Sequence, residues 1–84
     1  MTVYVVDDKC SYTGDCFATK VYAKREDAER ELRRLFSTFD GDTELTEISG
    51  DEEITADAAV RAGGFYYEND EFFGQVRIKE LSVL

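Results

Sequence analysis

Carboxylates are the side chains of this sequence with the clearest capacity for chemistry, because the chain has 19 acidic residues and no histidine. Without histidine, the commonest general base and the usual partner of a serine or cysteine nucleophile are both missing. Paired carboxylates can act as acid and base on glycosides, but they need a cleft that holds a sugar and raises one pKa. A chain of 84 residues rarely offers such a cleft. The sequence therefore predicts a binding protein rather than an enzyme.

Among known metal sites, the spacing of the acidic residues most resembles that of a calcium-binding loop. Asp40, Asp42 and Glu44 have the spacing of the first three ligands of such a loop. Leu45 then stands where the sharp turn needs glycine, and Asp51 stands where the loop needs a bidentate glutamate. We expect only weak, adventitious divalent binding there, and we predict no metal and no cofactor.

Cys10 and Cys16 flank a short polar segment that is typical of a hairpin tip. Two thiols without histidine cannot complete a four-ligand zinc site. A disulfide across the tip and a pair of free thiols both stay open, although a disulfide framework usually has more cysteines and a secretory leader. The first residues do not resemble a signal peptide, and no apolar run approaches the ~18 residues of a membrane span. We therefore expect a cytoplasmic protein without a membrane segment.

The acidic charge is concentrated in one part of the chain. Residues 1–34 have seven acidic and seven basic residues, whereas residues 35–76 have eleven acidic residues and a single base, Arg61. The formal net charge of the whole chain is −9. Such a field repels nucleic acids and acidic membranes and attracts basic surfaces. We therefore expect no direct binding of nucleic acid and predict a basic protein partner.

Two interpretations of the acidic segment stay open: a solvated surface that keeps the protein soluble, and a surface that imitates the phosphates of DNA. General acidity, as in a salt-adapted protein, would be spread over the whole surface. Carboxylates at every second residue of an extended segment lie ~6.6 Å apart. At this spacing they can contact the lysines and arginines with which a DNA-binding groove contacts successive phosphates. The candidate partner-binding acids are Asp40, Asp42, Glu44, Glu47, Asp51, Glu52, Glu53, Asp57, Glu68, Asp70 and Glu71.

Aromatic residues cluster in the last third of the chain, at Phe65, Tyr66, Tyr67, Phe72 and Phe73. Consecutive aromatics on a two-stranded ribbon place some rings toward the core and others away from it. Core packing is the commoner role, but the outward rings can anchor a protein interface. Tyr66 and Phe73 are the candidates for that interface.

The main helix that must support these residues is expected from Arg25 to Ser37. Its apolar residues recur at the helical period and form one stripe, which comprises Ala28, Leu32, Leu35, Phe36 and Phe39. The acidic residues lie in its first turns and the arginines in its later turns, the polarity that the helix dipole favours.

Strands and one short helix surround this main helix. The alternation of apolar residues and the turn signals predict strands over 3–8, 16–23, 43–48, 65–67 and 72–82. Thr55 can cap a short helix over 56–62 that Gly63 and Gly64 end. We predict one α+β domain over residues 1–84, with the order β-β-α-β-(α)-β-β. Its antiparallel sheet of four or five strands carries the main helix on one face.

The small size, the α+β composition and the localised acid together resemble the small acidic proteins with which bacteriophages disable host nucleic-acid machinery, in particular DNA-mimicking anti-CRISPR proteins. The resemblance implies that the candidate acids occupy the site where a subunit of a CRISPR–Cas effector grips duplex DNA or reads the protospacer-adjacent motif, in the host bacterial cytoplasm. It also requires the helix arginines, Arg25, Arg30, Arg33 and Arg34, to lie on another face. The alternative is an acidic interaction or adaptor module, for example a homodimer, that uses Tyr66 or Phe73.

Overall fold

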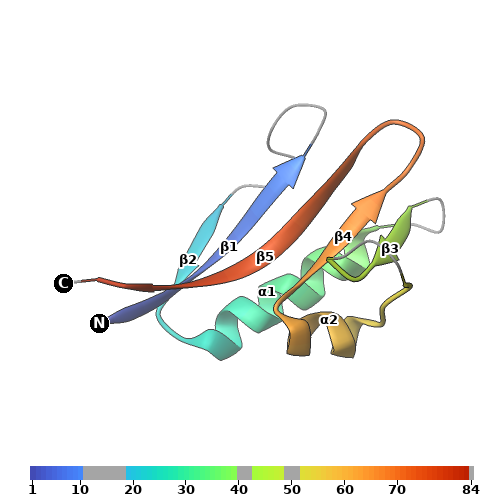
Figure 1. The fold of residues 1–84 in the computed structure, drawn as a ribbon. Coiled ribbons are helices and arrows are strands. Elements are labelled where there is room, and N and C mark those ends of the chain that lie inside the picture. Colours follow the sequence, from blue (N-terminus) through green and yellow to red (C-terminus); the bar gives the residue numbers. More distant parts are fainter. Residues whose placement is uncertain (11–18, 40–42, 49–51, 84) are drawn as a thin grey trace.

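The computed structural model describes residues 1–10, 19–39, 43–48 and 52–83, which form five strands and two helices (Figure 1). The α+β prediction is confirmed. In chain order the elements are β1 (Thr2–Cys10), β2 (Lys20–Tyr22), α1 (Arg25–Thr38), β3 (Glu44–Thr46), α2 (Ala56–Ala62), β4 (Gly64–Glu68) and β5 (Phe73–Ser82).

The strands form one antiparallel sheet in the order β2-β1-β5-β4-β3. The two longest strands, β1 and β5, lie at its centre and pair from Thr2↔Ser82 to Cys10↔Gly74. This pairing brings both chain ends together, so that the amide of Val83 donates to the carbonyl oxygen of Met1 at 2.6 Å (Figure 1). A central strand must bury one face, and on this face of β1 Val6 is buried in the core while Tyr4 packs against it.

Helix α1 lies against one face of the sheet because its apolar stripe points there. Ala28, Leu32 and Leu35 are buried in the core, and Phe36 and Phe39 pack against it. The predicted helix is confirmed and runs one residue further, to Thr38. Helix α2 lies beside α1 on the same side of the sheet (Figure 1). Neither helix in the described part of the chain has the length and apolar character that crossing a membrane requires.

The ends of α2 follow from two local signals. The side chain of Thr55 accepts a hydrogen bond from the amide of Ala58 at 3.2 Å, which satisfies a backbone donor of the first turn. Gly63 ends the helix with a φ of 79°, a left-handed conformation that favours glycine. The predicted cap and glycine stop are both confirmed.

Aromatic rings make up much of the core. Phe65 and Tyr67 of β4 are fully buried, and Phe39 stacks on Tyr67 with ring centroids 4.8 Å apart. Phe72 meets the edge of Tyr67 at 5.9 Å. The core role is therefore confirmed for these three members of the aromatic cluster, Phe65, Tyr67 and Phe72.

The two edge strands are shorter than the sequence patterns suggest. In its described part, β2 has only three residues, and residues 16–18, including Cys16, lie outside the described residues. Strand β3 ends at Thr46 because the chain folds back beside it. The amide of Glu47 donates to the carbonyl oxygen of Glu52 at 2.9 Å, and Thr46 pairs with Glu53 in a β-bridge. Residues 52–54 thus lie along the outer side of β3.

Candidate functional site

The sheet has one face that the helices leave uncovered, which we call the open face. Side chains alternate along a strand, so the neighbours of buried residues such as Val6, Phe65 and Val76 point away from the helices. The strand register assigns to the open face Val3, Val5, Asp7, Lys9, Val21, Glu44, Thr46, Tyr66, Glu68, Phe73, Gln75, Arg77, Lys79 and Leu81.

Acidic residues gather at the β3 side of the open face. Glu44 and Glu68 lie directly opposite each other on β3 and β4, and Glu53 lies opposite Thr46 on the next segment outward. Like charges on opposed residues destabilise a sheet, so this pair is not explained by stability. Exposed acidic residues of the adjoining turns continue the cluster. We call the set the acidic edge: Glu44, Glu47, Glu52, Glu53, Glu68, Asp70 and Glu71.

Three carboxylates of the acidic edge are not balanced by nearby bases in the described part of the chain. Within the described residues, no ion pair involves Glu44, Glu53 or Glu68. The helix arginines, in contrast, each lie close to an acid elsewhere. Their pairs are Arg25–Glu29, Arg30–Asp27, Arg33–Asp57 and Arg34–Glu31.

The structure separates the helix arginines from the acidic edge, as phosphate imitation requires. Helix α1 packs on the face of the sheet opposite to Glu44 and Glu68. The bases of the open face itself, Lys9, Arg77 and Lys79, belong to β1 and β5, whereas the acids of the acidic edge on this face belong to β4, β3 and the segment outside β3. The acidic edge and these bases therefore lie on different strands, while Asp7 on β1 lies among the bases and pairs with Lys79.

One of the predicted acids, Asp57, does not join this cluster. Asp57 lies in the first turn of α2, and its carboxylate is 2.6 Å from the guanidinium of Arg33, so its charge is compensated. Asp40, Asp42 and Asp51 lie outside the described residues. The described carboxylates come together across adjacent strands, and the alternation predicted for Asp40, Asp42 and Glu44 falls mostly outside the described residues.

Tyr66 and Phe73 lie next to the acidic edge on the open face. Their ring centroids are 6.4 Å apart, and Phe73 is 52% exposed. The hydroxyl of Tyr66 donates to a carboxylate oxygen of Glu68 at 3.3 Å. Partial burial raises the pKa of the Tyr66 phenol, and the negative charge of Glu68 adds to the effect. Tyr66 and Phe73 thus form an aromatic patch beside the carboxylates of the acidic edge.

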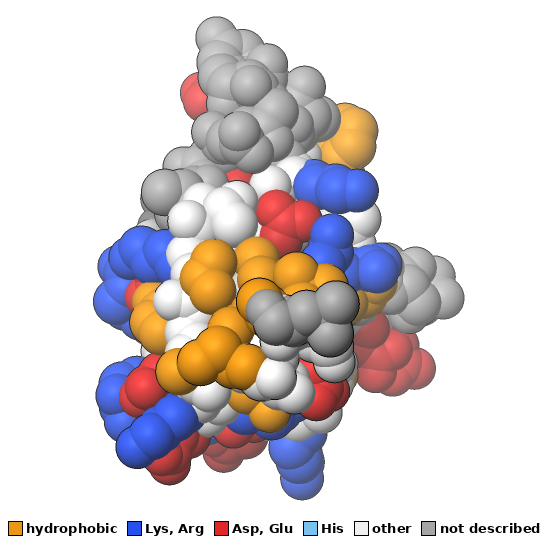
Figure 2. Space-filling view, turned by 90° about the vertical axis from the view of Figure 1, so that its left-hand side faces the viewer, with side chains coloured by type: hydrophobic (Ala, Val, Ile, Leu, Met, Phe, Trp, Pro, Cys, Tyr) orange, Lys and Arg blue, Asp and Glu red, His pale blue; other side chains and the backbone are white. Residues whose placement is uncertain are grey.

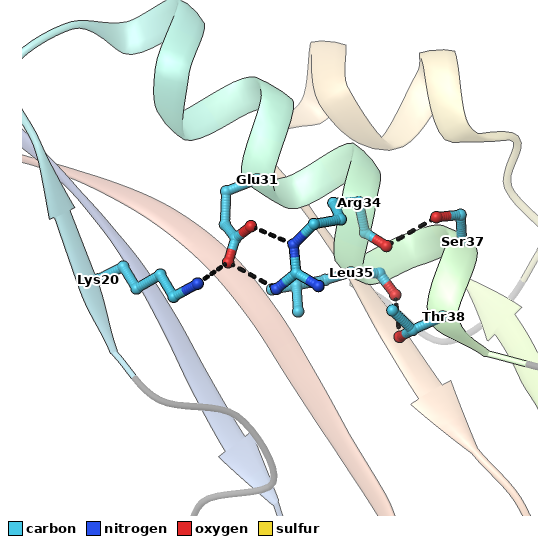
Figure 3. Close-up of polar contacts among 6 residues, drawn as sticks. All are labelled: Lys20, Glu31, Arg34, Leu35, Ser37 and Thr38. Carbon is cyan, nitrogen blue, oxygen red and sulfur yellow. Dashed lines mark hydrogen bonds and ion pairs between the residues drawn. The ribbon is translucent and has the colours of Figure 1, made fainter.

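Among the described carboxyl groups, Glu31 has the most strongly shifted pKa, and a shifted pKa is a common mark of an active site. Figure 3 shows Arg34 and Lys20 converging on it, with Arg34 Nε at 2.6 Å and Lys20 Nζ at 2.8 Å from its oxygens. The hydrogen bond from Arg34, helped by Lys20, lowers the pKa of Glu31 to about 2 against the opposing effect of burial. A carboxyl group that stays ionised is not a general acid at neutral pH. The ion pairs of Glu31 with Arg34 and with Lys20 therefore stabilise the packing of β2 against α1.

The role of Glu31 predicts an acid-sensitive contribution to stability. Because folding lowers the pKa from its ordinary 4.5 to about 2, the contribution is complete above pH 4.5 and is lost as the pH falls toward 2. At pH 7 we expect Glu31→Gln to reduce the free energy of unfolding by about 1–2 kcal/mol. Near pH 2 most of this difference between the variant and the native chain should be gone. Urea unfolding followed by circular dichroism at both pH values measures this, and an unchanged difference at pH 2 would disprove the assignment.

The second buried carboxylate, Asp8, was not anticipated from the sequence. The hydroxyl of Tyr67 donates to its Oδ1 at 2.6 Å inside the core. Burial and the carboxylate together raise the pKa of the Tyr67 phenol. No sequence signal links these residues, which are 59 positions apart.

Comparison of the chain with protein-family models, with curated proteins and with solved structures found no match.

Proposed function

We propose that the acidic edge binds a basic, nucleic-acid-binding surface of another protein in the place of DNA and so blocks it. The observation that supports this most directly is the opposed pair Glu44 and Glu68, which has no ion-pair partner within the described residues. The pair costs stability in the isolated protein. Lysines or arginines of a partner would remove that cost on binding.

The position of the carboxylates on paired strands favours binding. Side chains on a folded sheet have already lost much of the conformational entropy that an acidic tail must lose when it binds. Tyr66 and Phe73 add aromatic surface beside the charges, and tyrosine is enriched among residues that dominate interface energy. An acidic surface also accelerates encounter with a basic partner.

The resemblance to DNA-mimicking anti-CRISPR proteins makes a DNA-binding subunit of a CRISPR–Cas effector the first target to test. Such a subunit supplies the arginine- and lysine-lined groove that the acidic edge requires.

An interaction module without nucleic-acid imitation is the second candidate, and the exposure of Phe73 beside Tyr66 favours it. Binding through these rings, to another protein or to a second copy, would tolerate salt and would fail in Tyr66→Ala and Phe73→Ala variants. Binding through the acidic edge would weaken with salt because exposed charges are screened.

The function is tested by capture of proteins from bacterial lysate that contains CRISPR effector complexes. Two variants of equal net charge are compared with the native chain. The edge variant has Glu44→Gln, Glu53→Gln and Glu68→Gln. The control variant has Glu26→Gln, Glu29→Gln and Glu80→Gln, which lie away from the acidic edge. Retained proteins are identified by mass spectrometry.

We expect the native chain and the control variant to retain a DNA-binding subunit, and the edge variant to lose it. Equal retention by all three proteins, or retention only of partners without a basic groove, would contradict the proposal.

A further inference from the structure

A second surface on the open face has the opposite charge to the acidic edge. Asp7, Lys9, Gln75, Arg77 and Lys79 line a shallow hollow of about 90 Å³ over β1 and β5. It contains three bases and one acid, in a chain whose formal net charge is −9. In a protein with this excess of acidic residues, an exposed sheet face is expected to be acidic. The positive charge of this hollow therefore needs an explanation.

Two of the three bases, Lys9 and Arg77, form no ion pair within the described residues, although Arg77 lies opposite Asp7 in the strand register. Lys79 is 3.0 Å from a carboxylate oxygen of Asp7, and this contact lowers the pKa of Asp7, which the charge of Lys9 also lowers. Arg77 donates from Nε to the neutral oxygen of Gln75 at 2.9 Å, and neither Arg77 nor Lys9 forms an ion pair there. The bond to Gln75 leaves the terminal nitrogens of Arg77 for a ligand. A guanidinium held in this way suits a carboxylate or a phosphate.

Apolar side chains continue directly from this hollow. Val5 lies opposite Lys79 on β5 and opposite Val21 on β2. Val21 is 61% exposed and Leu81 is 48% exposed, which is high for side chains of this size. Figure 2 shows hydrophobic side chains gathered on the side of the molecule where the two termini lie, with lysine, arginine and acidic side chains beside them. A ligand of this surface needs both negative and apolar groups.

We infer that the hollow and its apolar border bind a short acidic peptide segment of a partner protein, with carboxylates on Arg77 and Lys9 and apolar side chains on Val5, Val21 and Leu81. The complementary charges give the specificity, and the burial of the exposed aliphatic side chains by the peptide contributes to the affinity. This surface lies on β1, β2 and β5, so the inference does not depend on the acidic edge.

A short peptide fits this surface better than an extended polyanion. At physiological salt, charges further apart than ~8 Å are largely screened, so a peptide responds mainly to the local positive charge. A DNA duplex or an anionic membrane covers a wider area and meets the acids on the same protein as well. The experiment below distinguishes binding of a DNA duplex and binding of an anionic membrane from binding of a peptide.

The test uses four separate ligands: a capped peptide of alternating leucine and glutamate, a matched peptide of leucine and glutamine, a DNA duplex and anionic vesicles. Binding to the full chain is followed by NMR chemical shifts of the backbone amides. The hollow variant has Lys9→Gln and Arg77→Gln. The control variant has Lys24→Gln and Arg61→Gln, two exposed bases away from the open face that give the same net charge.

We expect the glutamate peptide to shift amides of β1, β2 and β5 and the glutamine peptide to bind at least 10-fold more weakly. The hollow variant should lose at least 10-fold in affinity and the control variant less than 2-fold. The inference is overturned if the native chain does not bind the glutamate peptide at millimolar concentration, or if both variants lose affinity equally. Tighter binding of duplex DNA or of anionic vesicles at this surface, or its burial in a self-associated dimer, would also overturn it.

Discussion

Neutralising Glu44, Glu53 and Glu68 together should weaken binding to a basic partner about 100-fold at low salt. Each carboxylate that meets a cation at an interface contributes roughly 1 kcal/mol, and about 3 kcal/mol corresponds to a factor of about 100. The three side chains are exposed and lie on adjacent segments, so their removal leaves the core intact. Relief of the repulsion between Glu44 and Glu68 should even stabilise the fold slightly.

Calorimetric titration against the captured partner at 50 mM and 500 mM salt measures this effect. The native chain should lose affinity as salt rises, whereas the edge variant should depend on salt much less. The control variant, with Glu26, Glu29 and Glu80 neutralised, has the same net charge and should behave like the native chain. Equal losses in both variants would mean that only total charge matters, and the assignment of the acidic edge would be wrong.

Gly74→Ala should destabilise the fold by about 3 kcal/mol, which lowers the melting temperature by about 12–24 °C in a domain of this size. A Cβ at this position would overlap the carbonyl oxygen of Lys9 on β1 and the hydroxyl of Tyr67. The backbone of a paired central strand has little room to move. The hydroxyl of Tyr67 would have to leave Asp8, which would leave a buried carboxylate without this donor.

Thermal unfolding of Gly74→Ala is compared with that of Gln75→Ala, the next residue on the same strand. The side chain of Gln75 points to the open face, so its removal should change the free energy of unfolding by no more than about 0.5 kcal/mol. A melting temperature of Gly74→Ala within 3 °C of the native value would show that β1 and β5 can separate there, contrary to the register described above.

Local patterns in the sequence were sufficient for the elements that depend on local physics. The stripe of α1 has the helical period, Thr55 caps α2 and Gly63 ends it, and all three signals lie within a few residues of the structure that they specify. Alternation along the last strand likewise places Val76 and Ile78 toward the core, with Arg77 and Lys79 facing the other way.

The sites themselves depend on which strands are neighbours, and local patterns do not contain that information. The pairing of β3 with β4 brings Glu44 opposite Glu68, and the pairing of β1 with β5 brings Lys9 to Arg77. The concentration of acid in one segment did indicate where negative charge would gather. It did not indicate that Asp57 would be paired with Arg33, because that contact joins two helices that are separate in sequence.

The most direct test of the proposed imitation of DNA is a displacement experiment. A CRISPR effector complex is loaded with a fluorescent target duplex, and the release of the duplex is followed by anisotropy as the native chain, the edge variant and the control variant are titrated. We expect the native chain and the control variant to release the duplex and the edge variant to leave it bound. Binding of the native chain to the complex without release of the duplex would contradict the proposed imitation of DNA.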